Sequence, residues 1–196
     1  MARPDRLPWA LRLNPGIVPR MLILITGGSR SGKSGFALET AVRFKVPRIF
    51  LATAQADDEE MRQRIEAHRR DRPEGWSVVE EPCQVPRALR AALARAGTVI
   101  VDCLTIWISN LILQDQSFTE LEAAARAQEL ARAAAGTRSG VIVVTNEVGS
   151  GIVPDNALAR RFRDCAGRAN QVLAAAADEV HLMVSGIAIP VKKGLE

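Results

Sequence analysis

Eight consecutive residues near the start of the chain have the types and the spacing that bind a nucleotide phosphate. The pattern G-x-x-x-x-G-K-[ST] is met in full by Gly27, Gly28, Ser29, Arg30, Ser31, Gly32, Lys33 and Ser34. The glycines let the backbone curl so that successive N–H groups point at phosphate oxygens. The lysine of such a loop reaches the β- and γ-phosphates, and the serine hydroxyl ligates Mg²⁺. The segment therefore predicts a nucleotide-binding phosphate loop.

An aspartate supplies the acidic partner that such a loop needs. Residues 98–102 read TVIVD, a buried strand that ends in Asp102. An acid at the carboxyl end of this strand would hold Mg²⁺, directly or through water. Taken alone, Asp102 is equally consistent with a residue that caps the next helix. Beside the phosphate loop, the metal role is favoured, so we predict Ser34 and Asp102 as metal ligands.

A histidine further along the chain offers a nucleophile. Met61, Ile65 and His68 fall at i, i+4 and i+7 of a helix predicted over residues 57–72, so they share one face. This spacing alone favours a core or interface histidine. The helix follows a strand, however, so it starts at the sheet edge where α/β proteins bind ligands. Three arginines follow His68: Arg69, Arg70 and Arg72. They are suited to bind phosphates, or they simply complement the helix dipole.

The elements around these residues alternate between short apolar runs and helical patterns. Strands are predicted at residues 22–26, 48–53, 78–79, 98–102, 141–145, 179–184 and 187–191, the last two joined at Ser185-Gly186. Helices are predicted at residues 33–44, 57–72, 86–95, 104–113, 119–135 and 156–175. Thr119 and Glu122 form a capping box, and Gly136 ends that helix. The alternation predicts an α/β fold of the P-loop NTPase type (RecA-like), with a mainly parallel sheet and helices on both faces.

Length and composition are those of a globular chain. The 196 residues are 47% hydrophobic and 24% charged, and no apolar run approaches the ~18 residues of a membrane span. Residues 21–196 are predicted to form a single catalytic domain. Residues 1–20 contain four prolines and no sustained periodicity. We expect them to be a disordered leader without a catalytic part.

Charge and cysteine content argue against a nucleic-acid-binding protein and against a secreted protein. The leader carries four arginines and one aspartate, a charge of +3, which leaves only +1 of the total +4 for residues 21–196. With 4% aromatic residues as well, a nucleic-acid partner is not expected. The three cysteines form no C-x-x-C pair, and no signal peptide precedes them. A reducing cytoplasm is therefore the expected location.

Four segments carry a resemblance to a known family. They are GGSRSGKS after LILIT, LATAQADDEEMRQRIEAHRRDRPEGW, TNEVGSGIVP and ARRFRDCAGRANQVLAAAADEVHLMVSG. Together they resemble the bifunctional adenosylcobinamide kinase/adenosylcobinamide-phosphate guanylyltransferase family, from residue 21 to about 189. The third and fourth segments are far more specific than the phosphate loop, which many nucleotide-binding proteins share.

The resemblance implies two reactions in the assembly of the nucleotide loop of cobalamin. ATP or GTP would first phosphorylate the aminopropanol hydroxyl of adenosylcobinamide. GMP would then pass from GTP to adenosylcobinamide phosphate through a guanylylated histidine, giving adenosylcobinamide-GDP and pyrophosphate. His68 occupies the matching place. Some relatives have two adjacent histidines there, whereas this chain has Ala67 before His68.

The resemblance also implies further binding residues and an assembly. Those that would help to bind GTP are Ala52, Thr53, Ala54, Arg69, Arg70, Asp71, Arg72 and Glu80. Glu80 would accept two hydrogen bonds from guanine and so favour GTP over ATP. Family members assemble as homotrimers, and Arg160, Arg163 and Arg168 are candidates for salt bridges between subunits. Mg²⁺ would accompany the nucleotide.

Three assignments stay open. Asn146 and Glu147 either contact the corrinoid or give the loop its shape. His181 lies in a predicted strand and is expected to be structural. The rival functions are a monofunctional P-loop kinase of another small molecule, with His68 structural, and a nucleotide-dependent RecA-like binding protein. Labelling of the protein by GTP separates the guanylyltransferase from both.

Overall fold

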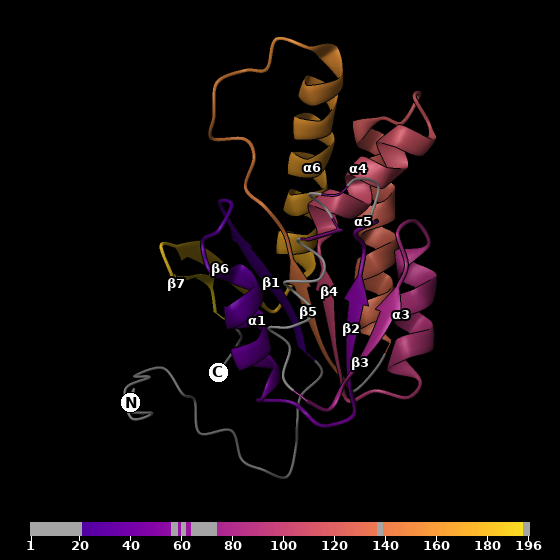
Figure 1. Cartoon of the computed structure of the whole chain (residues 1–196), viewed down its shortest axis with the longest axis vertical. Helices are drawn as coiled ribbons and strands as arrows, with labels where there is room; N and C mark the ends of the chain where they lie inside the picture. Colours follow the sequence, from indigo (N-terminus) through magenta and orange to yellow (C-terminus); the bar gives the residue numbers. More distant parts are fainter. Residues whose placement is uncertain (1–20, 56–58, 60–61, 64–73, 137–138, 194–196) are drawn as a thin grey trace.

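The computed structural model describes residues 21–55, 59, 62–63, 74–136 and 139–193 (Figure 1). Within these ranges, seven strands form one sheet in the order β3-β2-β4-β5-β1-β6-β7. All neighbours are parallel except β6 and β7, which form an antiparallel hairpin. Their bounds are β1 (Met21–Gly27), β2 (Arg48–Ala52), β3 (Trp76–Glu80), β4 (Thr98–Asp102), β5 (Gly140–Val144), β6 (Glu179–Val184) and β7 (Ile187–Lys192). The predicted mainly parallel sheet is confirmed.

Helices cover both faces of this sheet, as predicted (Figure 1). Ile23 and Ile25 of β1 pack with α1 on one face, and Leu22 and Leu24 pack with the other helices on the opposite face. β5 is buried along its whole length, which explains its continuous apolar sequence. The helices are α1 (Lys33–Ala41), α3 (Val85–Leu93), α4 (Leu104–Gln114), α5 (Glu120–Ala135) and α6 (Ala157–Ala176).

Two predicted helices have boundaries or faces that differ from the sequence pattern. α1 ends at Ala41 rather than at Phe44, because the next three N–H groups donate to carbonyls only three residues back. This tighter turn directs the ring of Phe44 into the core. On α6, the apolar stripe is buried at Cys165 and Ala169, but Leu158 is 48% exposed. Figure 1 shows why: the first turns of α6, like α4, extend beyond the sheet.

The predicted capping box is confirmed, and the structure adds a second helix cap. Glu122 N donates to Thr119 Oγ1 at 3.3 Å, and Thr119 N donates to Glu122 Oε2 at 2.7 Å, which is the predicted capping box of α5. Asn156 caps α6 by accepting from Ala159 N at 2.7 Å. Of the helix predicted over residues 57–72, only Glu59, Arg62 and Gln63 are described, and they are helical. The predicted leader lies outside the described residues.

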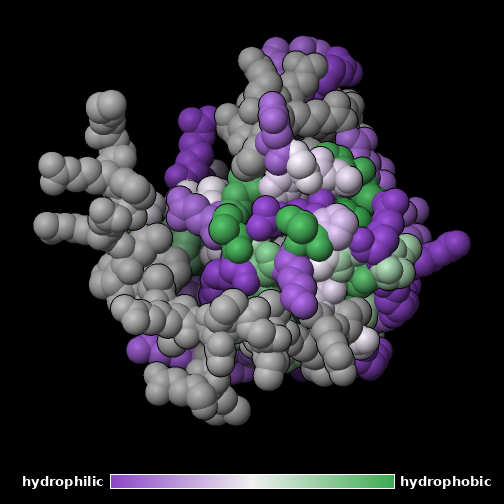
Figure 2. All heavy atoms as spheres, turned by 90° about the horizontal axis from the view of Figure 1, so that it is seen from below, coloured by the Kyte–Doolittle hydropathy of each residue, from purple (hydrophilic) through white to green (hydrophobic). Residues whose placement is uncertain are grey.

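The edge of the sheet where the parallel strands begin exposes two apolar side chains. They are Val42 and Val46, in the connection between α1 and β2. Figure 2, seen from this side, shows hydrophobic residues near the centre among hydrophilic ones. In the described residues, no helix combines the length and the hydrophobicity needed to cross a membrane.

A buried cluster of charged groups ties α1 to β6. Arg43 donates two hydrogen bonds to the Glu179 carboxylate, at 2.8 and 2.9 Å, and His181 Nε2 lies 3.0 Å from Glu179 Oε2. The His181 ring also packs edge-on against Phe36. Burial alone would raise the pKa of Glu179, but the hydrogen bonds and charges of His181 and Arg43 hold it at about 2. His181 thus has a structural contact, as expected.

The low pKa of Glu179 makes this cluster a source of stability that acid removes. Its folded pKa of about 2 lies below the ordinary 4.5, so the stabilisation is present above pH 4.5 and is lost as the pH falls towards 2. This difference corresponds to ~3 kcal/mol. Glu179→Gln is therefore expected to lower the free energy of unfolding by about that amount at pH 7. Between pH 5 and 2, the variant should lose less stability than the parent protein.

Urea unfolding of both proteins across this pH range provides the measurement. Glu129→Gln is the matched control, because Glu129 also contacts two arginines, Arg90 and Arg126, but at the surface. Its effect should stay below ~1 kcal/mol. Parallel pH profiles for Glu179→Gln and the parent protein would contradict this account.

Candidate functional site

The phosphate loop joins β1 to α1 at the carboxyl end of β1. Gly27 and Gly32 both have positive φ, 149° and 94°. A side chain on Gly27 would come within 2.5 Å of Met183 O in β6, so this position requires glycine. α1 begins at Lys33, so its N-terminus faces the loop. Backbone N–H groups and a helix N-terminus together favour an anion here.

Lys33 folds back over this loop. Its Nζ donates to Gly28 O at 2.6 Å and lies 3.5 Å from Ser31 Oγ, and the residue is only 8% exposed. Burial lowers the pKa of Lys33, although the nearby Cys103 and Asp102 act in the opposite direction. The neighbouring protein groups therefore do not fully replace the water that the buried Lys33 ammonium has lost. A phosphate oxygen would supply the missing negative charge.

The structure brings Ser34 and Asp102 together, as the sequence predicted. Ser34 Oγ donates to Asp102 Oδ2 at 2.9 Å, across 68 residues of sequence. The alternative of helix capping finds no support at the N-cap, since the N-cap residue of α4 is Cys103. Hydroxyl and carboxylate oxygens are ligands that suit Mg²⁺, which is usually held by one or two side chains together with phosphates and water. These two residues thus fit the ion, and would hold it where it neutralises phosphate charge.

Removing the Ser34 hydroxyl should weaken metal binding. We expect Ser34→Ala to raise the Mg²⁺ concentration for half-maximal ATP-dependent phosphorylation by about 10- to 100-fold. Ser34→Thr is the matched control, because it keeps a hydroxyl at the same place. Titration of Mg²⁺ at saturating ATP measures the effect. A Ser34→Ala variant that titrates like the parent protein would exclude Ser34 as a ligand.

Other predicted binding residues lie along the same edge of the sheet. Glu80, Ala52 and Asp102 are register partners at the carboxyl ends of β3, β2 and β4. Glu80 is exposed, whereas Thr53 is fully buried. The Thr53 hydroxyl donates to Cys103 O and accepts from Cys103 N, both at 2.8 Å. Its side chain thus holds the link between β4 and α4, and Ala54 follows it in the chain.

The second half of the predicted site cannot be located in the same way. His68, Arg69, Arg70, Asp71 and Arg72 lie outside the described residues. Their roles remain predictions.

Two distant segments support the phosphate loop, and sequence reasoning missed both. Gly186 N donates to Ser31 O at 3.0 Å, from the tight turn of the β6–β7 hairpin. Both turn residues, Ser185 and Gly186, have positive φ, as a two-residue hairpin turn requires. Glu147 N donates to Gly27 O at 3.1 Å. The S-G pair predicted the turn, but no local signal shows that it reaches the loop.

Asn146 has the contacts of a residue that shapes its loop. Its Nδ2 donates to Thr105 Oγ1 at 2.7 Å, and its carbonyl accepts from Asn170 Nδ2 at 3.1 Å. Glu147 Oε1 accepts from Gly149 N at 3.2 Å. The loop-shaping role left open by the sequence thus has direct support. The arginines proposed for a subunit interface also contact their own chain, at Pro154, Asp155, Asp164 and Gln171.

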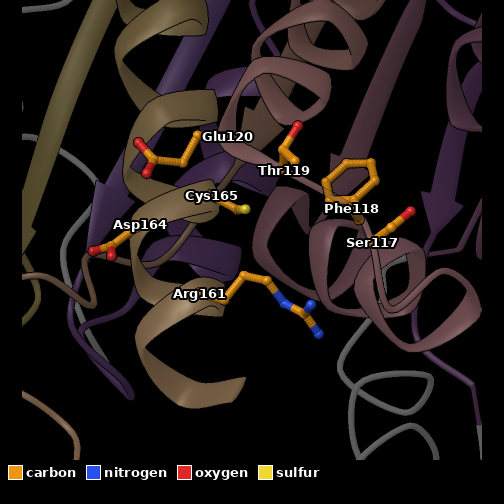
Figure 3. A pocket seen from close by; sticks show the side chains of 7 residues that line it. All are labelled: Ser117, Phe118, Thr119, Glu120, Arg161, Asp164 and Cys165. Carbon is orange, nitrogen blue, oxygen red and sulfur yellow. The ribbon is translucent and has the colours of Figure 1, made fainter. Parts of the chain in front are cut away.

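A cavity of about 500 Å³ lies away from the phosphate loop, between the α4–α5 turn and α6 (Figure 3). Figure 3 shows the Arg161 side chain extending towards this turn, where it donates to Gln116 O. None of the predicted nucleotide-binding residues lines the cavity. Its lining is Ser117, Phe118, Thr119, Glu120, Arg161, Asp164 and Cys165.

Two solved structures have a fold similar to that of most of this chain. The flagellar accessory protein FlaH from Methanocaldococcus jannaschii has a TM-score of 0.52 at 14% identity, covering 91% of this chain and 81% of its own. A second solved structure, an ATPase domain, has a TM-score of 0.50 at 16% identity, covering 83% and 69%. At these identities the likeness concerns the fold alone, and it confirms the predicted RecA-like α/β type.

Sequence comparison identifies the family. A family model described as cobinamide kinase / cobinamide phosphate guanyltransferase matches residues 23–191. The bifunctional adenosylcobalamin biosynthesis proteins CobU of Escherichia coli and Salmonella typhimurium are each 42% identical over 182 residues, 88% of this chain and 100% of theirs. CobP of Pseudomonas aeruginosa is 38% identical over 169 residues, 86% of this chain and 96% of its own. The chain belongs to the cobinamide kinase / cobinamide phosphate guanyltransferase family.

Proposed function

We propose that this enzyme phosphorylates adenosylcobinamide with ATP or GTP, and then transfers GMP from GTP to adenosylcobinamide phosphate. Family membership supports both activities, the kinase and the guanyltransferase. The observation that carries the proposal is the contact between Ser34 and Asp102 beside the buried Lys33. These groups form one place where the triphosphate of either nucleotide would bind.

In the kinase step, the loop holds the triphosphate while the cobinamide hydroxyl attacks the γ-phosphorus. A P–O bond to the hydroxyl oxygen forms, the hydroxyl proton passes to water, and the bond to the β-phosphate oxygen breaks. The loop N–H groups and Lys33 stabilise the charge on the leaving diphosphate. Mg²⁺ held by Ser34 and Asp102 would add to this neutralisation.

In the guanylyl step, we propose that His68 acts as the nucleophile. A neutral ring nitrogen attacks the α-phosphorus of GTP, an N–P bond forms, and pyrophosphate leaves. A phosphate oxygen of the corrinoid then attacks the same phosphorus and releases the histidine. The family resemblance supports this role, and the exposed carboxylate of Glu80 at the end of β3 is suited to accept hydrogen bonds from guanine.

The test is to label the purified protein with α-³²P-GTP and Mg²⁺. We expect a protein-bound label that is stable in base and labile in acid, as a phosphoramidate is. Adding adenosylcobinamide phosphate should move the label into adenosylcobinamide-GDP. γ-³²P-GTP should leave no such label on the protein. A protein that phosphorylates the corrinoid but never acquires the α-label would instead be a monofunctional kinase.

Three further parts of the proposal rest on the resemblance or on composition. The enzyme is proposed to use Mg²⁺, to act as a homotrimer and to reside in the cytoplasm. Sedimentation equilibrium would test the assembly, with a mass three times 21.2 kDa as the expected result.

A further inference from the structure

One side chain of α4 joins the two chain segments that leave β2 and β3. Asn110 Nδ2 donates to Thr53 O at 2.9 Å and to Pro82 O at 3.0 Å. Both amide hydrogens are therefore used, and both acceptors are backbone carbonyls. The two segments come from neighbouring strands, but beyond the strand ends the sheet ladder no longer holds them together. At this point, the two side-chain hydrogen bonds of Asn110 take the place of the backbone hydrogen bonds of the sheet.

Neighbouring contacts make this junction rigid. Trp107, one turn before Asn110 on α4, is fully buried, and its Nε1 donates to Cys83 O at 2.8 Å. Glu81 N donates to Ala52 O at 2.9 Å, the last backbone bond between the two segments in the described part of the chain. α4 itself starts two residues after Asp102. Through these hydrogen bonds, α4 holds the chain just beyond the ends of β2 and β3 in place.

One of the two joined segments follows directly on a residue proposed to bind guanine. Pro82 comes two residues after Glu80, the last residue of β3. The two segments differ in what else holds them: Thr53 also bonds to Asp102 O through its N–H, at 3.1 Å, and to Cys103 through its hydroxyl. We propose that Asn110 is a positioning residue for guanylyl transfer, which holds the segment after Glu80 at a fixed place relative to the end of β2. This inference rests on the proposed function.

Asn110→Leu tests the inference, because it keeps the size of the side chain and removes both donors. We expect the KM for GTP in enzyme guanylylation to rise by about 10- to 100-fold, since a displacement of about 1 Å has such an effect. The kcat and KM for ATP in cobinamide phosphorylation should change far less, because Thr53 keeps its bonds to Asp102 and Cys103. The preference for GTP over ITP, which lacks the guanine amino group, should fall because Glu80 is displaced. A merely structural role would not alter this preference.

Asn170→Leu is the matched control. Asn170 also donates from its amide to a backbone carbonyl beyond a strand end, that of Asn146 after β5, but on the other side of Asp102. It should lower stability without changing the preference for GTP over ITP. If Asn110→Leu does not fold, Asn110→Ser is measured in the same way.

The outcomes separate the two proposals. Equal labelling kinetics and equal GTP preference in Asn110→Leu and the parent protein would overturn the positioning role alone. An equal loss of GTP preference in Asn170→Leu would also overturn it, since the effect would then be general loosening. A parent protein that is never labelled by α-³²P-GTP would overturn the proposed function, and this inference with it.

Discussion

Replacing His68 with alanine is expected to abolish the label from α-³²P-GTP, while ATP still phosphorylates adenosylcobinamide. The imidazole supplies the nitrogen of the proposed N–P bond, so no other group replaces it. Loss of a covalent nucleophile lowers a rate by about 10⁴-fold or more. Phosphoryl transfer depends on the phosphate loop and Asp102, which the substitution leaves intact. The expected result is thus one lost activity in a folded enzyme.

The other histidine provides the control. The chain contains two histidines, and His181 contacts Glu179 and Phe36. His181→Ala should lower stability but keep the acid-labile label. Both variants are compared by labelling, by GMP transfer to adenosylcobinamide phosphate, and by ATP-dependent phosphorylation. A label that survives in His68→Ala, or the loss of both activities with the fold retained, would rule out separate roles.

Replacing Lys33 with methionine should have two opposite effects. Phosphoryl transfer is expected to fall by about 10²- to 10³-fold, because the Lys33 ammonium no longer stabilises the charge on the leaving diphosphate. The stability of the protein without nucleotide should rise. The pKa of Lys33 is lowered chiefly by burial, so its charged form is held at a cost that methionine avoids.

The pH dependence of the free energy of unfolding tests this prediction. Below the folded pKa of Lys33, the buried side chain is charged, and the cost of burying that charge is fully present. Between that value and the ordinary 10.5, the unfolded chain binds more protons than the folded protein, so the stability of the parent protein rises with pH. Lys33→Met should lack this rise. Urea unfolding from pH 7 to 10 measures it, with the exposed Lys45→Met as the control. A destabilised Lys33→Met would show that the contacts to Gly28 and Ser31 outweigh the burial.

Features that depend on neighbours in the sequence could be predicted. The phosphate loop, the capping box at Thr119 and the buried strands β1, β4 and β5 all have short-range signals. β3 was predicted only as residues 78–79, because this edge strand is half-exposed and lacks a continuous apolar run. The position of Asp102 beside the loop could be predicted because parallel strands end at a common edge, whereas its role as a metal ligand stays a prediction.

Features that depend on contacts between distant residues could not be predicted. Arg43 and Glu179 are 136 residues apart, and nothing near either one indicates the other. Asn110 looked like an ordinary polar residue of a helix, although it joins carbonyls 28 and 57 residues away. The helical pattern also did not predict the exposure of Leu158, because periodicity does not reveal where a helix extends past its sheet.

The order of strands in the sheet has a consequence for biosynthesis. Among the described strands, β1 leaves the ribosome first, yet its neighbours in the sheet are β5 and β6, which begin at Gly140 and Glu179. The phosphate loop also lacks one of its supporting contacts until Gly186 has been synthesised, because Gly186 N donates to Ser31 O. Pairing over such separations is slow, and it leaves apolar strands uncovered in the meantime. The nascent chain thus cannot complete the phosphate site, or gain stability from bound ATP or GTP, until β6 and β7 have been synthesised.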